Sequence, residues 1–580
     1  MRPSPGTVLA LCAIFAIAAR AQDRAPERPS GWIEKRAVES GRFMVAAANP
    51  LAVDAGYRIL KGGGSAVDAA ITVQLVLGLT EPQSSGLGGG AFLLAHDGRN
   101  HKLIAYDGRE VAPAAATPER FLDKNGKPLT FPDAVVGGRS VGVPGTVRLL
   151  EAAHRKHGKL PWAALFAPAI ALAENGFAVS PRLHRLIAAE KDLQPRAQAY
   201  FLDADGRPRA IGTILKNPAY AATLRRLARE GADAFYAGSI AQDIVDTVRG
   251  HRTNPGDMTL ADLANYRVKV RAPVCERYRR YRVCGMPLPS SGGITVLQML
   301  KILEPYDMKS MGPVSFWSVH FVSEAGRLAY ADRSVYEADP DFYAPPEGLL
   351  DDAYLRARSQ SISTTGSLGR ATPGDPPAIA APARNAAWGE DTALQFPSTS
   401  HISVVDQYGN AVAMTTTIED QFGSRLMTNG GFLLNNELTD FSFVPTDNGK
   451  PVANRVEPGK RPRSSMAPTI VYDATGRVYM VAGSPGGSAI INYVTKTLVG
   501  VLDWGLDPQR AIDLPNFGSG NGPTELEANT SVAALAPKLR ALGHEVSVME
   551  HTSGLHAIVR TKRGWIGGAD PRREGTVKGG

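Results

Sequence analysis

The residue with the clearest chemical potential is Thr399, at the head of the alternating strand 400–406. Inside an unbroken chain its hydroxyl has no base beside it. If the bond between Ser398 and Thr399 is cut, Thr399 gains a free α-amine, whose pKa of roughly 7.7–8.0 leaves much of it unprotonated near neutral pH. One residue then supplies both a nucleophile and a general base. The alternative is that Thr399 merely begins a strand.

The strand after Thr399 is predicted to form a hairpin with strand 411–417. The connecting residues 407–410 include a glycine and an asparagine, which is typical of a hairpin turn. Counted from a pairing of residue 406 with residue 411, Ser400 lies opposite Thr417 and Thr399 lies diagonal to it, within one residue of register. The hydroxyl of Thr417 is therefore a predicted hydrogen-bond partner of Thr399, although β-propensity alone also explains a threonine there.

Other polar residues along the chain have types that bind a charged substrate. They are Arg109 at the end of a short strand, the carboxylates Glu419, Glu437 and Asp440, the hydroxyls Ser464 and Ser465, and the glycine turn with Gly486 and Gly487. An arginine binds a carboxylate through two parallel hydrogen bonds. The amides of a glycine turn can point together at an oxyanion. Taken singly, each has a structural alternative, such as a surface arginine or an acidic helix start.

The order of these pieces carries more information than any one of them. Thr399-Ser-His-Ile-Ser-Val-Val-Asp, Thr417-Ile-Glu, Asn435-Asn-Glu-Leu-Thr-Asp, Arg461-Pro-Arg-Ser-Ser-Met and Gly483-Ser-Pro-Gly-Gly resemble the small-subunit motifs of γ-glutamyltransferases. The segments 49–50, 62–68, 81–90, 107–110 and 289–293 resemble large-subunit motifs of the same family. The resemblance implies an N-terminal-nucleophile hydrolase fold of the α+β class: a four-layer αββα sandwich with two mostly antiparallel sheets.

The resemblance also implies a role for each candidate residue. Thr399 would be the self-cleavage residue, cutting at Ser398–Thr399, and then the nucleophile, hydrogen-bonded by Thr417. The α-carboxylate of a γ-glutamyl group would be held by Arg109, Ser464 and Ser465, its α-ammonium by Glu419, Glu437 and Asp440, and the oxyanion by the amides of Gly486 and Gly487. No cofactor or metal is implied. Residues 441–463 are shorter than the lid loop of some relatives and lack its tyrosine, which predicts a more open pocket.

Three functions follow as hypotheses. The first is a γ-glutamyl hydrolase/transferase that acts on glutathione and similar compounds through a γ-glutamyl-threonine ester, with water, an amino acid or a peptide as acceptor. The second is a glutaryl or cephalosporin-type acylase of the same family, which the acidic residues disfavour because glutaryl lacks the α-ammonium. The third is an unprocessed, non-catalytic exported binding protein.

The organisation of the chain follows from its ends and from the predicted cut. Residues 1–21 contain an apolar run followed by Ala19-Arg-Ala, which predicts a cleavable signal peptide and an exported, periplasmic or secreted protein. Residues 22–398 and 399–580 would then be the large and small subunits of a heterodimer that forms one compact unit. The proline-rich stretch 359–396 has no strong period and is predicted to be a mobile linker.

Composition and cysteine usage agree with an exported globular enzyme. The 580 residues are 43% hydrophobic and carry a formal net charge of +8, spread along the chain without a basic stripe. The densest basic cluster, 277–282, is interpreted as a solvated hairpin in preference to a nucleic-acid site. A turn at 279–280 places Cys275 opposite Cys284, which predicts a disulfide, with two free thiols as the alternative.

Local signals predict two helices near the start of the mature chain. Asn49-Pro50 and Gly62 bracket one helix, and Ser65 with Asp68 begins the next. The glycines at 86–90 follow without the Gly-Lys-Ser/Thr ending of a phosphate-binding loop. They are therefore interpreted as a site of close backbone packing or a turn.

Overall fold

The computed structural model describes residues 31–377, 388–393 and 398–580. The predicted signal peptide, 1–21, lies outside the described residues. In the part of the chain that is described, no helix combines the length and the apolarity needed to cross a membrane.

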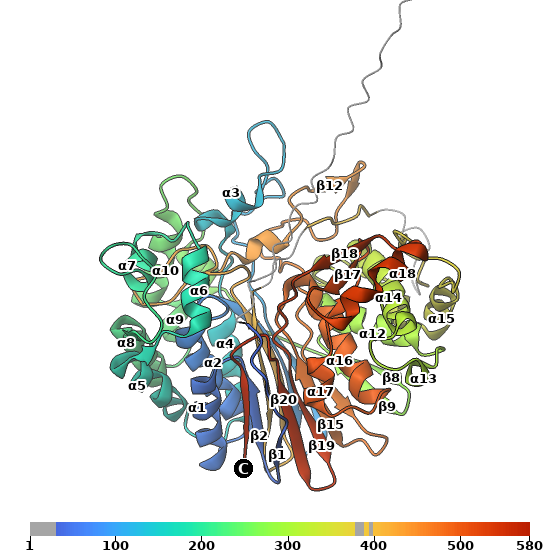
Figure 1. The fold of residues 1–580 in the computed structure, drawn as a ribbon. Helices are drawn as coiled ribbons and strands as arrows, with labels where there is room; N and C mark the ends of the chain where they lie inside the picture. The colour runs from blue at the N-terminus through green and yellow to red at the C-terminus, as the bar shows by residue number, and fades with distance from the viewer. Residues whose placement is uncertain (1–30, 378–387, 394–397) are drawn as a thin grey trace, which may run out of the picture.

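Two seven-stranded antiparallel sheets form the centre of the molecule (Figure 1). The sheet that follows Thr399, called here the Thr399 sheet, has the order β21 (Thr576–Gly579), β2 (Met44–Ala47), β10 (Ser400–Val405), β11 (Ala411–Thr417), β3 (Gly90–Asp97), β4 (Lys102–Gly108) and β7 (Lys269–Arg271). The second sheet has the order β1 (Val38–Ser40), β20 (Gly564–Ala569), β19 (His556–Thr561), β15 (Val478–Gly483), β14 (Thr469–Tyr472), β9 (Tyr281–Gly285) and β8 (Val274–Tyr278).

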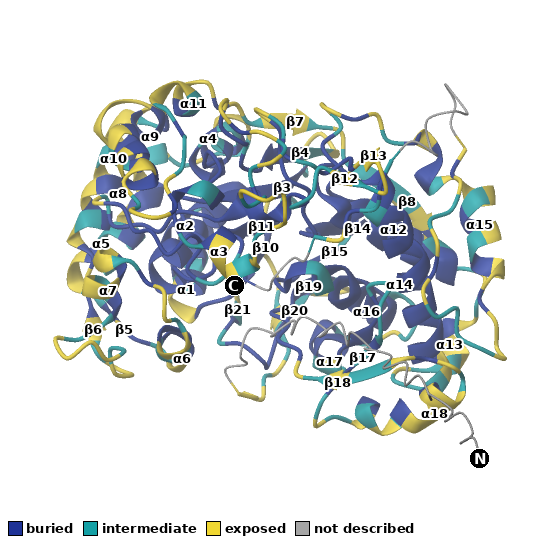
Figure 2. Cartoon of the chain, turned by 90° about the horizontal axis from the view of Figure 1, so that it is seen from above, coloured by how far each residue is buried: buried dark blue, intermediate teal, exposed yellow. Residues whose placement is uncertain are grey.

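Helices cover the outer face of each sheet. The Thr399 sheet is covered mainly by α1 (Pro50–Lys61), α2 (Ala66–Thr80), α4 (Thr146–His157), α5 (Ala167–Asn175), α8 (Pro218–Glu230) and α10 (Gly238–Arg249). The second sheet is covered by α12 (Ser291–Leu303), α14 (Phe316–Tyr336), α16 (Ile490–Leu502) and α17 (Pro508–Asp513). Seen from above in Figure 2, the buried residues concentrate in the sheets and in the helices on either side of them. The predicted αββα sandwich is confirmed.

Smaller elements surround these layers. They are the helices α3 (Phe131–Val135), α6 (Pro181–Ala189), α7 (Pro195–Phe201), α9 (Asp233–Tyr236), α11 (Leu260–Ala264), α13 (Met308–Met311), α15 (Asp352–Gln360) and α18 (Ala536–Ala541), and the small sheets β5 (Phe177–Ala178) with β6 (Ile214–Leu215), β12 (Thr446–Asp447) with β13 (Lys450–Pro451), and β16 (Phe517–Gly518), β17 (Thr524–Glu527) and β18 (Val546–Met549).

The alternation of side chains along β10 explains why the strand is buried on both faces. Ile402 and Val404 belong to the core under α1 and α2. His401 and Ser403 point the other way, between the sheets, because successive strand residues face opposite sides. A Cβ on Gly483 of β15 would lie 2.2 Å from the ring of His401, so this glycine makes room for the imidazole.

The local predictions near the mature N-terminus are confirmed. The side chain of Asn49 accepts a hydrogen bond from the amide of Leu51 at 2.9 Å, and Pro50 is the first residue of α1. Ser65 and Asp68 form a reciprocal capping box at the start of α2. Both caps satisfy amide groups that have no partner inside the helix.

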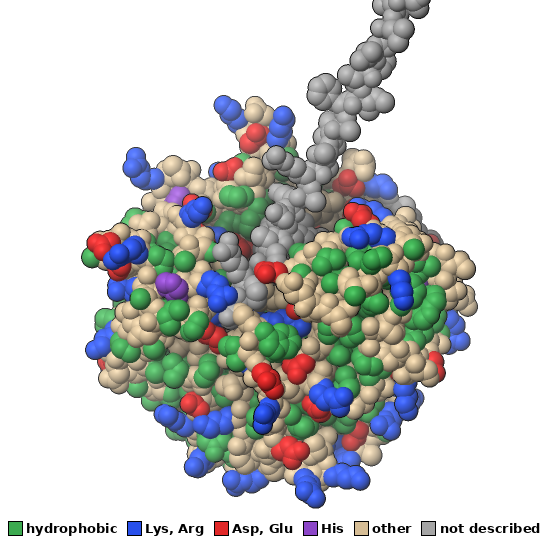
Figure 3. All heavy atoms as spheres, in the orientation of Figure 1, with side chains coloured by type: hydrophobic (Ala, Val, Ile, Leu, Met, Phe, Trp, Pro, Cys, Tyr) green, Lys and Arg blue, Asp and Glu red, His purple; other side chains and the backbone are tan. Residues whose placement is uncertain are grey.

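The hairpin of β8 and β9 also forms as predicted. Cys275 lies opposite Cys284 with a Cα–Cα distance of 4.1 Å, and the two residues form a disulfide. The basic side chains of this hairpin find local partners, such as the carboxylate of Asp503 for Arg279 at 2.8 Å. On the face drawn in Figure 3, basic and acidic side chains lie interspersed.

The described residues of the stretch 359–396, which is predicted to be a mobile linker, contact the body of the molecule. The amide of Leu368 donates to Glu324 at 2.8 Å, and the amide of Gly374 donates to Asp332 at 2.8 Å. Asp391 forms a buried ion pair with Arg463 at 2.8 Å. These contacts attach the stretch to the body, because buried carboxylates accept its polar groups. Residues 378–387 and 394–397 lie outside the described residues.

Candidate active site around Thr399

Thr399 lies directly opposite Thr417 at the open end of the β10–β11 hairpin. Ser400 pairs with Thr416 and Val405 pairs with Ala411, so the predicted register is wrong by one residue. The turn is longer than predicted because the carboxylate of Asp406 accepts from the amides of two turn residues, at 2.8 and 2.9 Å. The shift brings Thr417 closer to Thr399 than the predicted diagonal placement.

The hydroxyls of Thr399 and Thr417 converge on the carbonyl of Ser398. The two hydroxyl oxygens are 3.2 Å apart, and Thr417 donates to the Ser398 oxygen at 3.1 Å. Thr399 also donates to that oxygen. The amide of Glu419 in turn donates to the Thr417 hydroxyl at 2.9 Å, which leaves the Thr417 proton for Ser398. Glu419 adopts φ = 75°, an uncommon left-handed conformation for a residue with a side chain.

The glycine-rich stretch 81–90 packs against this pair of threonines. The Ser398 hydroxyl donates to the carbonyl of Gln83 at 2.8 Å. A Cβ on Gly89 would lie 2.0 Å from the carbonyl oxygen of Thr417, which only glycine avoids. The prediction that these glycines serve close backbone packing is confirmed.

A small cavity of about 20 Å³ opens beside the two threonines. It is lined by Arg109, Ser398, Thr399, Thr417, Glu419, Glu437, Asp440, Ser464, Ser465, Met466, Gly487 and Ile490. All six substrate-binding residues predicted from the sequence therefore line one cavity, whereas Gly486, predicted to help form the oxyanion hole, is not part of its lining. In the uncut chain this space is only large enough for about one water molecule.

Arg109 occupies the centre of the polar lining. It follows β4, and its guanidinium forms ion pairs with Glu437 and Asp440, which belong to the 3₁₀ turn Glu437–Asp440. The same guanidinium donates to the carbonyls of Pro462 at 3.1 Å and Arg463 at 2.9 Å. The guanidinium of Arg109 is thus in direct contact with the carboxylates of Glu437 and Asp440. The sequence, in contrast, predicts that the arginine and the carboxylates bind opposite ends of a substrate.

Burial dominates the electrostatics of this group. It raises the pKa of Glu437 well above its usual value and raises that of Asp440, while the charge of Arg109 opposes both shifts. Burial also raises the pKa of the neighbouring Glu110 to about 8. Burial by itself lowers the pKa of Arg109, but the charges of Glu437 and Asp440 outweigh burial and raise this pKa overall. One guanidinium serves several carboxyl groups, so the site favours an additional cation.

The two serine hydroxyls belong to a wall of the cavity formed by a loop that pairs with residues 289–291. The hydroxyl of Ser464 accepts a hydrogen bond from the amide of Met466 at 3.1 Å. The Ser465 hydroxyl accepts from Arg333 of α14 at 2.7 Å. Arg333 also donates to Ser291 at 2.8 Å, which orients this wall.

The glycine turn begins at the end of β15 and leads into α16. Gly486 has φ = 139° and Gly487 has φ = 56°, conformations that side chains disfavour. A Cβ on Gly486 would lie 2.6 Å from the ring of Tyr493. Gly487 lines the cavity and is the first residue of the 3₁₀ turn Gly487–Ala489, which continues into α16.

Sequence reasoning missed several residues that shape the site. Asn436 donates its amide to the carboxylate of Glu419, and Arg333 reaches Ser465 from α14. Arg573 donates to the carbonyl of Thr399 at 3.3 Å. Asn436 lies within a motif quoted above and could have been found there. The two arginines have no local signal, because their contacts depend on the packing of distant segments.

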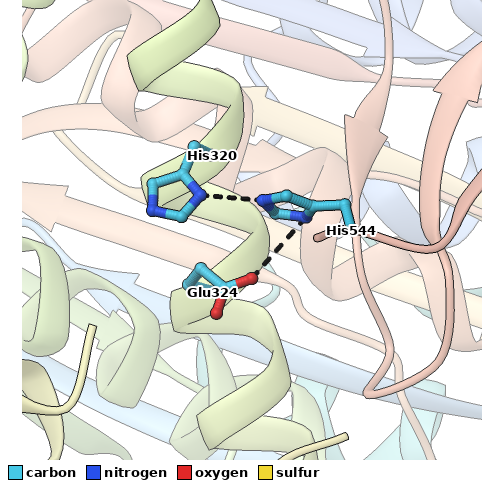
Figure 4. A group of neighbouring side chains, drawn as sticks. All are labelled: His320, Glu324 and His544. Carbon is cyan, nitrogen blue, oxygen red and sulfur yellow. Dashed lines mark hydrogen bonds and ion pairs between the residues drawn. The ribbon is translucent and has the colours of Figure 1, made fainter. Parts of the chain in front are cut away.

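In the described part of the chain, one group of side chains has the composition of a metal site: His320 and Glu324 of α14 with His544 (Figure 4). His320 donates from Nε2 to the carbonyl of Ser363 at 2.9 Å, so its Nδ1 accepts from Nε2 of His544 at 2.8 Å. Nδ1 of His544 then accepts from the hydroxyl of Thr524 at 2.8 Å. Both neutral imidazoles are satisfied by protein groups, so the geometry is that of a hydrogen-bonded pair.

Two antiparallel sheets packed between helices, with a threonine at the head of a central strand, define the class of N-terminal-nucleophile hydrolases. Comparison with known proteins agrees. The gamma-glutamyltranspeptidase family model matches residues 52–580. The chain therefore belongs to the gamma-glutamyltranspeptidase family.

Some similar proteins are named glutathione hydrolases, and others are named acylases. The chain is 38% identical to the glutathione hydrolase proenzyme of Bacillus subtilis over 527 residues, which cover 90% of this chain and 88% of that protein. It is 35% identical to the acylase ACY 1 proenzyme of a Pseudomonas strain over 557 residues, covering 92% and 93%. Its fold matches the crystal structure of cephalosporin acylase from Bacillus halodurans with a TM-score of 0.80 and 28% identity, covering 94% and 97%.

Proposed function

We propose that this chain is the precursor of a γ-glutamyl hydrolase/transferase that acts on glutathione and related γ-glutamyl compounds. The observation that carries the proposal is the cavity beside Thr399, where three carboxylates and one arginine meet the two threonine hydroxyls. An excess of carboxylates suits a substrate that brings its own cation, as the α-ammonium of a γ-glutamyl group does.

The first step is self-cleavage between Ser398 and Thr399. The Thr399 hydroxyl attacks the carbonyl carbon of Ser398, the C–N bond breaks, and the acyl group moves to the Thr399 oxygen as an ester. Water then releases Ser398 as a carboxylate and leaves Thr399 with a free α-amine. Support comes from Thr417, whose hydroxyl donates to the Ser398 oxygen and stabilises negative charge there.

The second step repeats this chemistry on the substrate. Ser398 lines the cavity of the uncut chain, so its departure would vacate the place where the γ-carbonyl of a substrate has to sit. Thr399 attacks that carbonyl, its α-amine takes the hydroxyl proton and gives it to the leaving amine, and a γ-glutamyl ester forms. Water, an amino acid or a peptide amine then releases the product.

Specific roles follow for the cavity residues. Arg109, Ser464 and Ser465 bind the α-carboxylate, and Glu419, Glu437 and Asp440 bind the α-ammonium. The amides of Gly486 and Gly487 stabilise the oxyanion. Binding requires the ion pairs of Arg109 with Glu437 and Asp440 to rearrange. The substrate carboxylate then pairs with Arg109, and the substrate ammonium pairs with the two acidic side chains.

The processed parts are proposed to stay together as a heterodimer of 22–398 and 399–580. The Thr399 sheet contains β2, β3, β4 and β7 from the first part and β10, β11 and β21 from the second. Each sheet is therefore completed by both parts, and separation would expose strand edges and core. The signal peptide, 1–21, would direct export before this assembly.

A denaturing gel combined with two substrates tests the proposal. The wild type should give bands of about two-thirds and one-third of the mature mass, and Thr399→Ala should give one uncut band. The wild type should hydrolyse γ-glutamyl p-nitroanilide faster than glutaryl p-nitroanilide. Faster glutaryl hydrolysis would assign the chain to the acylases instead, and an uncut but active wild type would contradict the mechanism.

A further inference from the structure

A buried arginine near the C-terminus contacts the main chain of Thr399. Arg573 follows β20, and its Nη1 donates to the Thr399 carbonyl at 3.3 Å, while its Nη2 donates to the carbonyl of Thr552 at 3.2 Å. Its side chain is buried, with 1% of its surface exposed. None of the roles assigned above uses this residue.

We propose that Arg573 is a positioning residue for Thr399, and that its charge also lowers the pKa of the α-amine that self-cleavage creates. The inference rests on the proposed function. In this proposal, the charge of Arg573 makes the new N-terminal amine an effective base near neutral pH.

The positioning part follows from geometry. Strand pairing in β10 begins at Ser400, so the carbonyl of Thr399 lies just outside the paired residues. Arg573 supplies a donor for that carbonyl and joins it to the Thr552 segment through the same planar guanidinium. Because the peptide plane after Thr399 is held, rotation about its Cα–C bond is the main backbone freedom left to its nitrogen and side chain.

The electrostatic part follows from distance. The nitrogen and the carbonyl oxygen of one residue are three bonds apart, so the guanidinium lies within about 7 Å of the Thr399 nitrogen. With an effective dielectric constant of about 20, a unit positive charge at that distance lowers the pKa of an amine by roughly one unit or more. A lower pKa increases the unprotonated fraction at pH 7.

The other charges near Thr399 set the amine pKa from which Arg573 lowers it. Glu81, Asp570, Tyr493, Arg182 and His556 face Arg573 from neighbouring elements, and the cavity beside Thr399 carries Arg109, Glu419, Glu437 and Asp440. Burial raises the pKa of Glu81 to about 8, and this carboxyl has Arg182 as an ion-pair partner at 3.3 Å. Asp570 has Arg572 as an ion-pair partner at 3.2 Å.

The test compares Arg573→Gln, Arg573→Lys and wild type. In the processed enzymes, two pH dependences are measured: that of kcat/KM for γ-glutamyl p-nitroanilide, and that of acylation of the Thr399 amine, followed by peptide mass spectrometry. Removing the charge in Arg573→Gln should move the acidic limb and the amine pKa upward by about one unit. Arg573→Lys keeps the charge but does not reach both carbonyls, so we expect an unchanged amine pKa and a kcat lowered about tenfold, with KM within about twofold.

Arg327→Gln is the matched control. Arg327 is also buried, and it also donates to main-chain carbonyls, including that of Gly369 at 2.6 Å, but in the network of α14. Its loss should lower stability without moving the amine pKa.

The possible outcomes separate the two proposals. An Arg573→Gln enzyme with the wild-type amine pKa, or an Arg573→Lys enzyme with the wild-type kcat, would overturn the inference while leaving the proposed function intact. If Arg573→Gln does not fold, the Lys variant decides the positioning part through its kcat, and Arg573→Met, which keeps the length of the side chain without its charge, decides the electrostatic part through its amine pKa. A wild type that is neither cut nor active would instead remove the proposed function.

Discussion

The hydroxyl of Thr417 has three neighbours, and together they assign the direction of its proton. The amide of Glu419 donates to it, Thr399 lies 3.2 Å away, and the Ser398 oxygen accepts from it at 3.1 Å. A donor aimed at a scissile carbonyl stabilises the charge that develops there during self-cleavage. We therefore propose that this position requires the hydroxyl group as well as strand propensity.

Replacing Thr417 by valine keeps the shape of the side chain and removes the donor. We expect self-cleavage to slow by about 10²–10³-fold, the usual cost of losing one oxyanion donor. The appearance of the small band on a denaturing gel over time measures the rate. Thr417→Ser keeps the hydroxyl and should cut within about tenfold of wild type, and equal rates for the valine and serine variants would contradict the assignment.

Asp440 tests the recognition of the substrate cation. Asp440→Asn keeps the shape and a hydrogen-bond acceptor but removes a charge that now pairs with Arg109. A hydrogen bond to a charged group contributes about 1.5–3 kcal/mol, so kcat/KM for γ-glutamyl p-nitroanilide should fall by about 10–100-fold. Glutaryl p-nitroanilide has no α-ammonium and should lose less than about threefold. An equal loss for both substrates would argue for a structural role.

At the scale of elements, the turn 86–90 is the wall against which the end of β11 packs. The absence of side chains at Gly88 and Gly89 allows the turn to approach the carbonyls of Leu433 and Thr417, where a Cβ would lie within about 2 Å. The two neighbours are main-chain groups of separate segments, so neither can yield without moving its whole segment.

Gly89→Ala should therefore displace Thr417 and abolish self-cleavage, with a loss of stability of a few kcal/mol, about the cost of forced overpacking. Gly366→Ala is the control, since nothing lies within 4 Å of its added Cβ. Thermal melting and the gel assay distinguish them. A Gly89→Ala chain that is cut at the wild-type rate would contradict the close-packing argument.

At the scale of the whole molecule, stability depends on keeping several buried histidines neutral. Burial lowers the pKa of His544 and of His96 to about 4, and that of His556 to about 3. In the unfolded chain a histidine has a pKa of about 6.5, so the unfolded state binds more protons between that value and the folded pKa. Each such residue therefore reduces the free energy of unfolding as pH falls through this window.

The contribution of His544 can be isolated by difference. Relative to His544→Gln, the wild type should lose up to about 3 kcal/mol of unfolding free energy between about pH 6.5 and pH 4, because lowering a histidine pKa from its ordinary value to about 4 corresponds to roughly that amount. Denaturant titrations of both proteins at pH 7, 5 and 4 measure the difference. Subtraction removes the opposing contribution of buried carboxyls such as Glu110, and a pH-independent difference would show that His544 does not titrate as described.

Much of this molecule was predictable wherever the determining contacts are local. The caps at Asn49 and Ser65 and the pairing of Cys275 with Cys284 depend on residues a few positions apart, whose hydrogen-bond geometry follows from the backbone. The register of the hairpin after Thr399 was wrong by one residue, because a carboxylate in the turn lengthened the connection.

Thr399 shows most clearly which features the sequence determines and which depend on the tertiary structure. By itself, the sequence determined the residue types: a threonine able to become a terminus, a second threonine in the paired strand and a set of charges in family order. Only the tertiary structure placed Arg573, 174 positions away, on the carbonyl of Thr399, and Arg109 against Glu437 and Asp440. The physical reason is that these contacts arise from the packing of sheets and loops, and no local spacing rule encodes that packing.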